Sequence, residues 1–116
     1  MPGSVKALLL CLPCLLCASI SLAQEDGRQL FLDNCAECHQ SDGQGLDNIY
    51  PALAGNETVL GSGADVALVL RIGRGEMPSF KDALSFAEMA AIINYVRNSW
   101  GNSGAEITAE EVGKLF

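Results

Sequence analysis

Several features that define common protein classes are scarce or missing in this chain of 116 residues. No run of alternating β-branched residues predicts a strand, and no internal repeat or low-complexity tract follows the apolar N-terminal segment. Basic residues are few, seven against 14 acidic ones, so nucleic acid and anionic lipid are poor partners for its surface. Because the strand patterns are missing, we expect an all-α fold.

An apolar run long enough to span a bilayer is also missing. The longest one, Ala7–Ile20, has 14 residues, whereas a transmembrane helix needs roughly 20. It follows Lys6 and precedes the small residues at 21–23, which is the layout of a secretory signal peptide. We therefore expect a signal peptide at 1–23 and one periplasmic domain at 24–116, with no permanent membrane anchor. Loss of Lys6 would change the net charge from −7 to −8.

One short segment contains the only histidine and both of the cysteines that lie outside the expected signal peptide. Cys35, Cys38 and His39 lie within the stretch FLDNCAECHQSDGQG at 31–45, and His39 is the only histidine. The other three cysteines fall within the expected signal peptide, where they are small hydrophobic residues. Three chemistries use such a cluster: a redox-active dithiol, part of a zinc site, and covalent attachment of haem.

The residues around the cluster favour haem over the other two chemistries. A thioredoxin-like dithiol follows a strand, whereas the residues before Cys35 have a helical pattern. A zinc site usually has four ligands, and only three thiol or imidazole ligands are present in the expected mature chain. Covalent haem uses all three residues, because each thiol adds to one vinyl group and the adjacent histidine binds the iron. The motif at 35–39 therefore predicts one haem c and its iron.

A second axial ligand for the iron must come from a different side chain. Two methionines lie outside the expected signal peptide, and Met89 falls on the apolar face of a predicted helix, which is typical of a core residue. Met77 lies in the loop GRGEMPSF, whose glycines and proline can present a thioether to a metal. We expect His39 and Met77 to ligate the iron and leave no open position, which predicts a carrier of single electrons rather than an enzyme.

Apolar residues at spacings of three and four predict three helices. They cover Asp26 to Asn34, about Asp65 to Ile72, and Ser85 to Trp100, where SFAE is a capping-box sequence and Gly101 would end the helix. The glycine-rich segments between these helices are long, so we expect them to wrap the cofactor.

In the order of its elements the chain resembles a class I cytochrome c. An N-terminal helix, CxxCH, an extended loop, a methionine in a glycine-rich loop and a C-terminal helix follow one another. The chain is most similar to the haem domain that ends the cytochrome subunits of membrane-bound quinoprotein alcohol dehydrogenases, through four strings: YPALAGN (50–56), MPSF (77–80), INYVRNSWGN (93–102) and ITAEEVGKL (107–115). The resemblance implies a small cytochrome c fold of three to five helices around one covalently attached haem. Those domains belong to chains with three haems, whereas this chain has a single CxxCH.

The resemblance also implies roles for individual residues. Six would hold the haem or its iron: Cys35, Cys38, His39, Pro51, Leu53 and Met77. Among them, the Pro51 carbonyl would accept a hydrogen bond from the ring of His39 and fix its orientation and tautomer, and Leu53 would pack on the haem face.

The resemblance further implies how the first and last helices meet. The helix that contains Gly27 and Phe31 would cross the last helix near Ile93 and Tyr95, with the glycine permitting close approach.

The function that follows is transfer of single electrons in the periplasm from a dehydrogenase to an oxidase or another cytochrome, by a monomer or a small subunit. A haem subunit held within one dehydrogenase complex is the alternative. A haem enzyme or gas sensor, in which Met77 dissociates, is disfavoured because no second histidine is available as a distal base. Three basic residues, Arg71, Arg74 and Lys81, cluster around Met77 in the sequence. They are interpreted as a docking rim, as partners of a haem propionate, or as ordinary solvated surface.

Overall fold

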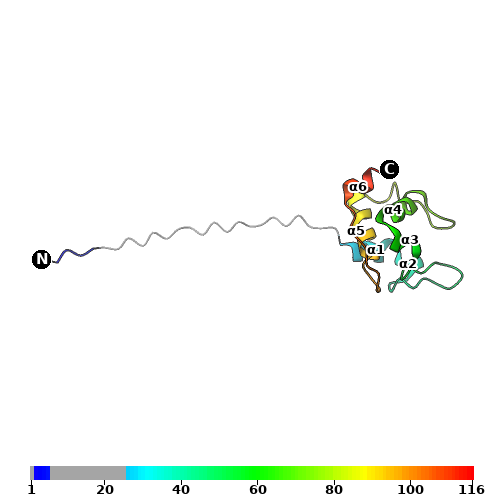
Figure 1. The fold of residues 1–116 in the computed structure, drawn as a ribbon, viewed down its shortest axis with the longest axis horizontal. Helices are drawn as coiled ribbons and strands as arrows, with labels where there is room; N and C mark the ends of the chain where they lie inside the picture. The colour runs from blue at the N-terminus through cyan, green and yellow to red at the C-terminus, as the bar shows by residue number, and fades with distance from the viewer. Residues whose placement is uncertain (1, 6–25) are drawn as a thin grey trace.

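The structure is a computed structural model, and it describes residues 2–5 and 26–116. Apart from 2–5, the expected signal peptide lies outside the described residues and stays a prediction. The described part of the chain is helical and contains no strand, which confirms the all-α fold (Figure 1). None of the described helices combines the length and the apolar character needed to cross a membrane.

Six helices occur in the described residues: α1 (Gly27–Asn34), α2 (Ala36–His39), α3 (Glu57–Gly61), α4 (Gly63–Ile72), α5 (Phe86–Val96) and α6 (Ala109–Gly113). The three predicted helices correspond to α1, α4 and α5. The other three helices have only four or five residues. Such short helices carry too few apolar positions to show a helical period in the sequence.

Side-chain caps fix where the longer helices begin. Ser85 and Glu88 exchange hydrogen bonds of 3.1 and 2.7 Å, so the predicted capping box is present. Helix α4 begins two residues before the predicted start at Asp65, because the Ser62 hydroxyl accepts a hydrogen bond of 3.0 Å from the Asp65 amide. It ends at Ile72, as predicted, and the next residue, Gly73, has a φ of 77°.

Helix α5 is shorter than its apolar pattern predicts. The pattern continues to Trp100, whereas the helix ends at Val96. The side-chain amide of Asn102 donates a hydrogen bond of 2.8 Å to the Val96 carbonyl, which a longer helix would use for the Trp100 amide. Trp100 itself has a φ of 53°, outside the helical region. The two preceding carbonyls are likewise taken by side chains, since Asn98 Nδ2 donates to Asn94 at 3.0 Å and Ser99 Oγ donates to Tyr95 at 2.6 Å. Side chains thus replace the backbone donors that would continue the helix.

Helices α1 and α5 lie side by side in a close crossing (Figure 1). A Cβ atom at Gly27 would lie 2.3 Å from the Ala91 carbonyl oxygen and 3.0 Å from the Cβ of Tyr95, so only glycine fits there. Phe31 is fully buried, with its ring centroid 5.4 Å from that of Tyr95 and 5.1 Å from that of Trp100. The predicted crossing is confirmed at Tyr95, with its tightest contact at Ala91.

The core lies between α1, α4, α5 and α6. Its largest fully buried side chains are Phe31, Met89, Ile93 and Val112. Two loops leave this body on the same side in Figure 1, one between α2 and α3 and one between α4 and α5. The first contains Pro51 and Leu53 and the second contains Met77, so the helical core places both predicted haem-binding loops on one side of the molecule.

Candidate haem-binding site

Cys35 separates the first two helices. Its backbone angles, φ −125° and ψ −34°, leave the helical region, so α1 ends at Asn34 and α2 begins at Ala36. The amides of Cys38 and His39 donate to the Cys35 carbonyl at 3.2 and 3.0 Å, which forms one helical turn. The two cysteines are not joined by a disulfide, and both are half-buried. Two thiols one turn apart match attachment to the two vinyl groups of one porphyrin.

The environment of the Cys35 thiol favours its protonated form. Burial, and to a lesser degree the neighbouring Cys38, raise the pKa of the Cys35 thiol to about 11. Dithiol exchange uses the thiolate, and this raised pKa disfavours the thiolate of Cys35. Across residues 2–5 and 26–116, no three side chains of His, Cys, Asp or Glu come close enough together to hold a metal ion.

One hydrogen bond fixes the ring of His39, the predicted axial ligand. Its side chain is buried, with 8% exposed, and its Nδ1 lies 2.9 Å from the Pro51 carbonyl oxygen. Because a carbonyl only accepts hydrogen bonds, Nδ1 carries the proton and Nε2 keeps its lone pair for a metal. The contact that the resemblance implies is therefore present in the structure.

The loop after His39 folds back on α2 through glycines. The Gly45 amide donates to the His39 carbonyl at 2.9 Å, and the Gly43 carbonyl accepts a hydrogen bond of 2.7 Å from the Leu53 amide. Gly45 has a φ of 62°, and a Cβ atom there would lie 2.4 Å from the Tyr50 carbonyl oxygen. Leu53 is half-buried and packs against the core. Glycine is thus needed at 45 to bring the end of the loop back to His39.

Met77 lies in a tight turn between α4 and α5. Arg74 and Met77 pair through two backbone hydrogen bonds, each 3.0 Å long. Gly73 precedes the turn with a φ of 77°, and a Cβ atom there would lie 2.5 Å from the Met77 carbonyl oxygen. The Met77 side chain is half-buried and packs against the core. The glycine-rich sequence therefore forms a compact turn that directs a thioether toward the interior.

Asn102 is an important residue that the sequence reasoning missed. It is 8% exposed and makes three hydrogen bonds to backbone groups. Its Oδ1 accepts from the Gly55 amide at 2.8 Å, and its Nδ2 donates to the carbonyls of Leu53 and Val96 at 3.0 and 2.8 Å. The one signal for Asn102 in the sequence is its place at the end of the string INYVRNSWGN. Its partner Gly55 lies 47 residues away, so their contact leaves no local pattern.

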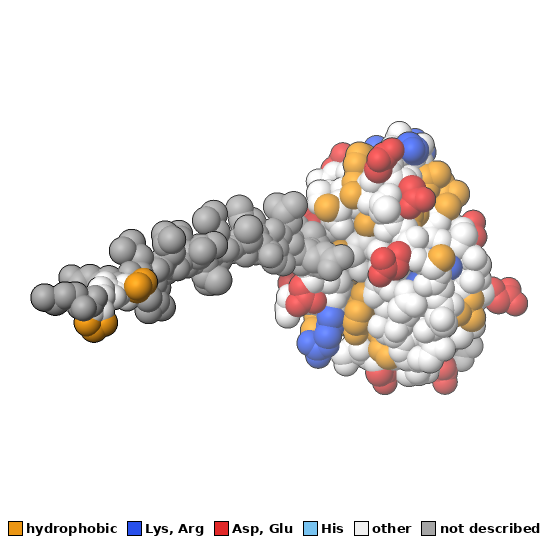
Figure 2. Space-filling view, turned by 60° about the vertical axis from the view of Figure 1, so that its left-hand side comes forward, with side chains coloured by type: hydrophobic (Ala, Val, Ile, Leu, Met, Phe, Trp, Pro, Cys, Tyr) orange, Lys and Arg blue, Asp and Glu red, His pale blue; other side chains and the backbone are white. Residues whose placement is uncertain are grey.

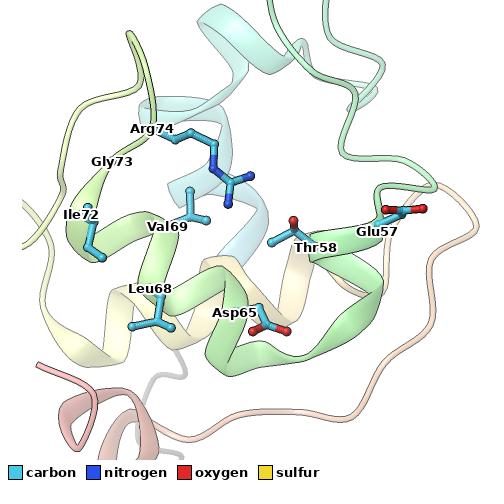
Figure 3. A pocket seen from close by; sticks show the side chains of 8 residues that line it. All are labelled: Glu57, Thr58, Asp65, Leu68, Val69, Ile72, Gly73 and Arg74. Atoms are coloured by element: carbon cyan, nitrogen blue, oxygen red, sulfur yellow. The ribbon is translucent and has the colours of Figure 1, made fainter.

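The predicted basic cluster around Met77 is divided in the structure. The Arg71 guanidinium donates to the Leu115 carbonyl and lies 5.5 Å from the centre of the Phe116 ring, which ties it to the C-terminal segment. Arg74 instead points toward a surface hollow (Figure 3). The two arginines therefore do not share one role.

The hollow beside Arg74 has a volume of about 490 Å³ and lies against α3 and α4. In Figure 3 the guanidinium of Arg74 and the side chains of Val69 and Thr58 point into the same space. The remaining lining residues are Glu57, Asp65, Leu68, Ile72 and Gly73. The positively charged guanidinium of Arg74 thus lies over a partly apolar surface close to the turn that carries Met77.

Taken together, the donors fit haem c. A pair of thiols one helical turn apart, an imidazole with a free Nε2 and a half-buried thioether are the groups that covalent attachment and two axial ligands need. The structure joins His39 to Pro51 directly and packs Leu53 and Met77 against the same core.

Comparison with known proteins gives a consistent result. The family model described as cytochrome C oxidase, cbb3-type, subunit III, matches residues 22–96. The cytochrome c subunit of the quinone alcohol dehydrogenase of Gluconobacter oxydans is 35% identical over 77% of this chain and 21% of its own length. Cytochrome c-552 of Thermus thermophilus is 34% identical over 87% of this chain and 81% of its own. The chain spans about a fifth of the length of the first relative.

Solved structures give the same fold. Cytochrome c6C from Synechococcus superimposes with a TM-score of 0.57 and 27% identity, over 66% of this chain and 98% of its own. The KustC0563 c-type cytochrome superimposes with a TM-score of 0.54 and 29% identity, over 62% of this chain and 94% of its own.

Proposed function

Because the chain belongs to the cytochrome c family, in the group of the cbb3-type subunit III model, and binds haem c covalently, we propose that it carries single electrons in the periplasm. The observation that supports this most directly is the geometry of His39, whose Nδ1–H is bound to Pro51 and whose Nε2 is free. A carrier needs an iron held by two protein ligands, and a fixed imidazole supplies the first of them.

We assign the attachment and ligand roles as follows. Cys35 and Cys38 form the thioether bonds, and His39 and Met77 are the axial ligands. When bound, the haem supplies a one-electron couple at its iron. Donation of the His39 N–H to the Pro51 carbonyl increases the electron density on the imidazole. The soft Met77 thioether favours the reduced iron.

With both axial positions filled by protein, the chain is not an enzyme in this proposal. The disfavoured alternative, a haem enzyme or gas sensor, needs Met77 to leave the iron. The two hydrogen bonds that close its turn and the packing of its side chain against the core oppose that motion.

The electron donor in this proposal is a dehydrogenase, and the acceptor is an oxidase or another cytochrome. Relatives are named as cytochrome subunits of an alcohol dehydrogenase, a gluconate 2-dehydrogenase and a fructose dehydrogenase. The alternative is a haem subunit held within one such complex. Purification from cells separates the two, because a carrier elutes alone at its own mass and a subunit elutes with a large dehydrogenase chain.

The surface of the molecule suits protein partners better than nucleic acid. Acidic side chains are scattered over the face in Figure 2, where basic ones are few, in line with the net charge of −7. A polyanion would be repelled by this surface, whereas a redox partner with basic groups around its own docking site would be attracted.

Two spectra of the purified protein test the proposal. A pyridine haemochrome spectrum reports haem bound through two thioethers, and the weak far-red band of the oxidised protein reports methionine sulfur on ferric iron. We expect both signals, and we expect the reduced protein to bind carbon monoxide slowly or not at all. Rapid carbon monoxide binding by the wild type would contradict the carrier function.

A further inference from the structure

Asn102 connects the loop around the proposed site to the end of α5. Its side chain is buried and makes its three hydrogen bonds to backbone groups of two separate segments. Two of them reach Leu53 and Gly55 in the loop, and the third reaches Val96 at the last turn of α5. Both amide hydrogens and the carbonyl oxygen of the side chain are thus used.

The loop segment that Asn102 holds directly follows the group that orients the axial histidine. Leu53, whose carbonyl accepts from Asn102, is two residues beyond Pro51. The Pro51 carbonyl accepts the ring N–H of His39. With only Ala52 between these two residues, a displacement of Leu53 is passed to Pro51 through the covalent chain.

A strained turn delivers Asn102 to this position. Trp100 and Gly101 both have positive φ values, 53° and 85°. A left-handed conformation is strained for a residue other than glycine, and contacts nearby must offset that strain at Trp100. Its ring packs against Gly43, where a Cβ atom would lie only 2.4 Å away. The turn therefore contacts the loop twice, through Trp100 at its start and through Asn102 at its end.

We propose that Asn102 is a positioning residue for the axial ligand His39. By fixing the carbonyl of Leu53 and the amide of Gly55, it keeps the Pro51 carbonyl on the imidazole N–H. It thereby helps to set the electron density on the iron and the reduction potential. This inference rests on the proposed ligand role of His39.

Asn94 on α5 provides a matched control. Asn94 also makes paired backbone hydrogen bonds, since its Nδ2 donates to the Ile107 carbonyl at 2.9 Å and its Oδ1 accepts from the Ile107 amide at 2.8 Å. These bonds hold the C-terminal segment and not the loop that contains Pro51. Asn94→Ala therefore removes a similar set of hydrogen bonds without touching the restraint on His39.

The experiment compares Asn102→Ala and Asn94→Ala as holoproteins. NMR follows the exchange of the His39 Nδ1 proton with water, and electrochemistry gives the reduction potential. We expect exchange about tenfold faster in Asn102→Ala than in wild type, the factor set by one lost hydrogen bond. We also expect a more positive potential, because a less electron-rich imidazole stabilises the oxidised iron less. Asn94→Ala should change the exchange rate by no more than about twofold and should leave the reduction potential unshifted.

A second variant covers the case in which Asn102→Ala does not fold. Asn102→Asp keeps the size and the acceptor for the Gly55 amide but cannot donate to Leu53 and Val96 while ionised. We expect the same direction of change in the exchange of the His39 Nδ1 proton, while the potential is compared for Asn102→Ala alone, because the new carboxylate charge itself stabilises the oxidised iron. If either folded variant matches Asn94→Ala in exchange, or if Asn102→Ala leaves the potential unshifted or moves it to more negative values, the inference is wrong. If the wild type itself lacks methionine and histidine ligation in its spectra, the proposed ligand set is wrong instead.

Discussion

The His39 ring and the Pro51 carbonyl lie 2.9 Å apart, although twelve residues separate them in the chain. The contact forms because the loop closes on itself, with the Gly45 amide on the His39 carbonyl and the Leu46 amide on the Tyr50 carbonyl, each at 2.9 Å. The orientation of the proposed axial ligand is therefore a property of the loop and not of the helix that carries it.

Loss of the proposed second ligand should open the iron. We expect Met77→Ala to abolish the far-red band of the oxidised protein and to allow rapid binding of carbon monoxide after reduction. Met89→Leu is the control, because Met89 is fully buried in the core and a volume-conserving change costs less than about 1.5 kcal/mol there. An unchanged far-red band in Met77→Ala would remove Met77 from the site.

Each proposed thioether depends on one thiol. We expect Cys35→Ser and Cys38→Ser each to retain haem through a single thioether, and the double variant to lose its haem to acidic organic solvent. The pyridine haemochrome band should move stepwise, because each lost thioether restores one vinyl group to the porphyrin. Retention of extraction-resistant haem in the double variant would refute the attachment sites.

The close approach at Gly45 predicts a stability difference between two glycines of the same loop. Gly45 and Gly55 have similar φ values, 62° and 68°, but a Cβ atom meets the Tyr50 carbonyl at 2.4 Å in the first case and nothing within 4 Å in the second. Gly55→Ala should cost about 1 kcal/mol, the strain of a left-handed alanine. Gly45→Ala should cost at least about twice as much and shift the His39 ring signals in NMR spectra. Equal free energies of unfolding in the two variants would contradict the steric argument.

Acid should weaken the C-terminal helix through Glu111. A hydrogen bond from the Thr108 amide to the Glu111 carboxylate lowers the pKa of this residue below its ordinary value of 4.5. A carboxyl group with a lowered pKa in the folded state stabilises the protein above its unfolded pKa. That contribution is lost as the pH falls from about 4.5 through the folded value. Glu111→Gln should flatten the pH dependence of the unfolding free energy in this range. Glu110→Gln, on the same helix, is the matched control.

The charge at Arg74 predicts an effect of salt on electron transfer. If this residue contributes to docking, Arg74→Gln should slow reduction by the partner several-fold at low ionic strength and much less at high ionic strength. Arg28→Gln on α1, which is also exposed, should have a smaller effect. Equal slowing at both salt concentrations would exclude the docking role and favour a local role beside Met77.

The structure confirms the predicted helices and the predicted capping box, which rest on residues close together in the sequence. Helical periods predicted α1, α4 and α5, and the serine and glutamate that open α5 form their predicted capping box. The motif at 35–39 indicated haem c because it combines two thiols and an imidazole within one helical turn. Each of these signals depends on residues at most four positions apart, so the sequence carries them without knowledge of the fold.

The remaining features depend on residues that only the fold brings together. Asn102 reaches Leu53 across 49 positions and also donates to the Val96 carbonyl at the end of α5, four residues before the end that the apolar pattern predicts. Arg71 leaves the predicted basic cluster because the C-terminal segment packs beside it. The sequence by itself determined the cofactor and the helical class, since both follow from local spacing. The tertiary structure decided which backbone groups hold the loop around His39, because a hydrogen-bond partner dozens of residues away leaves no trace in local sequence.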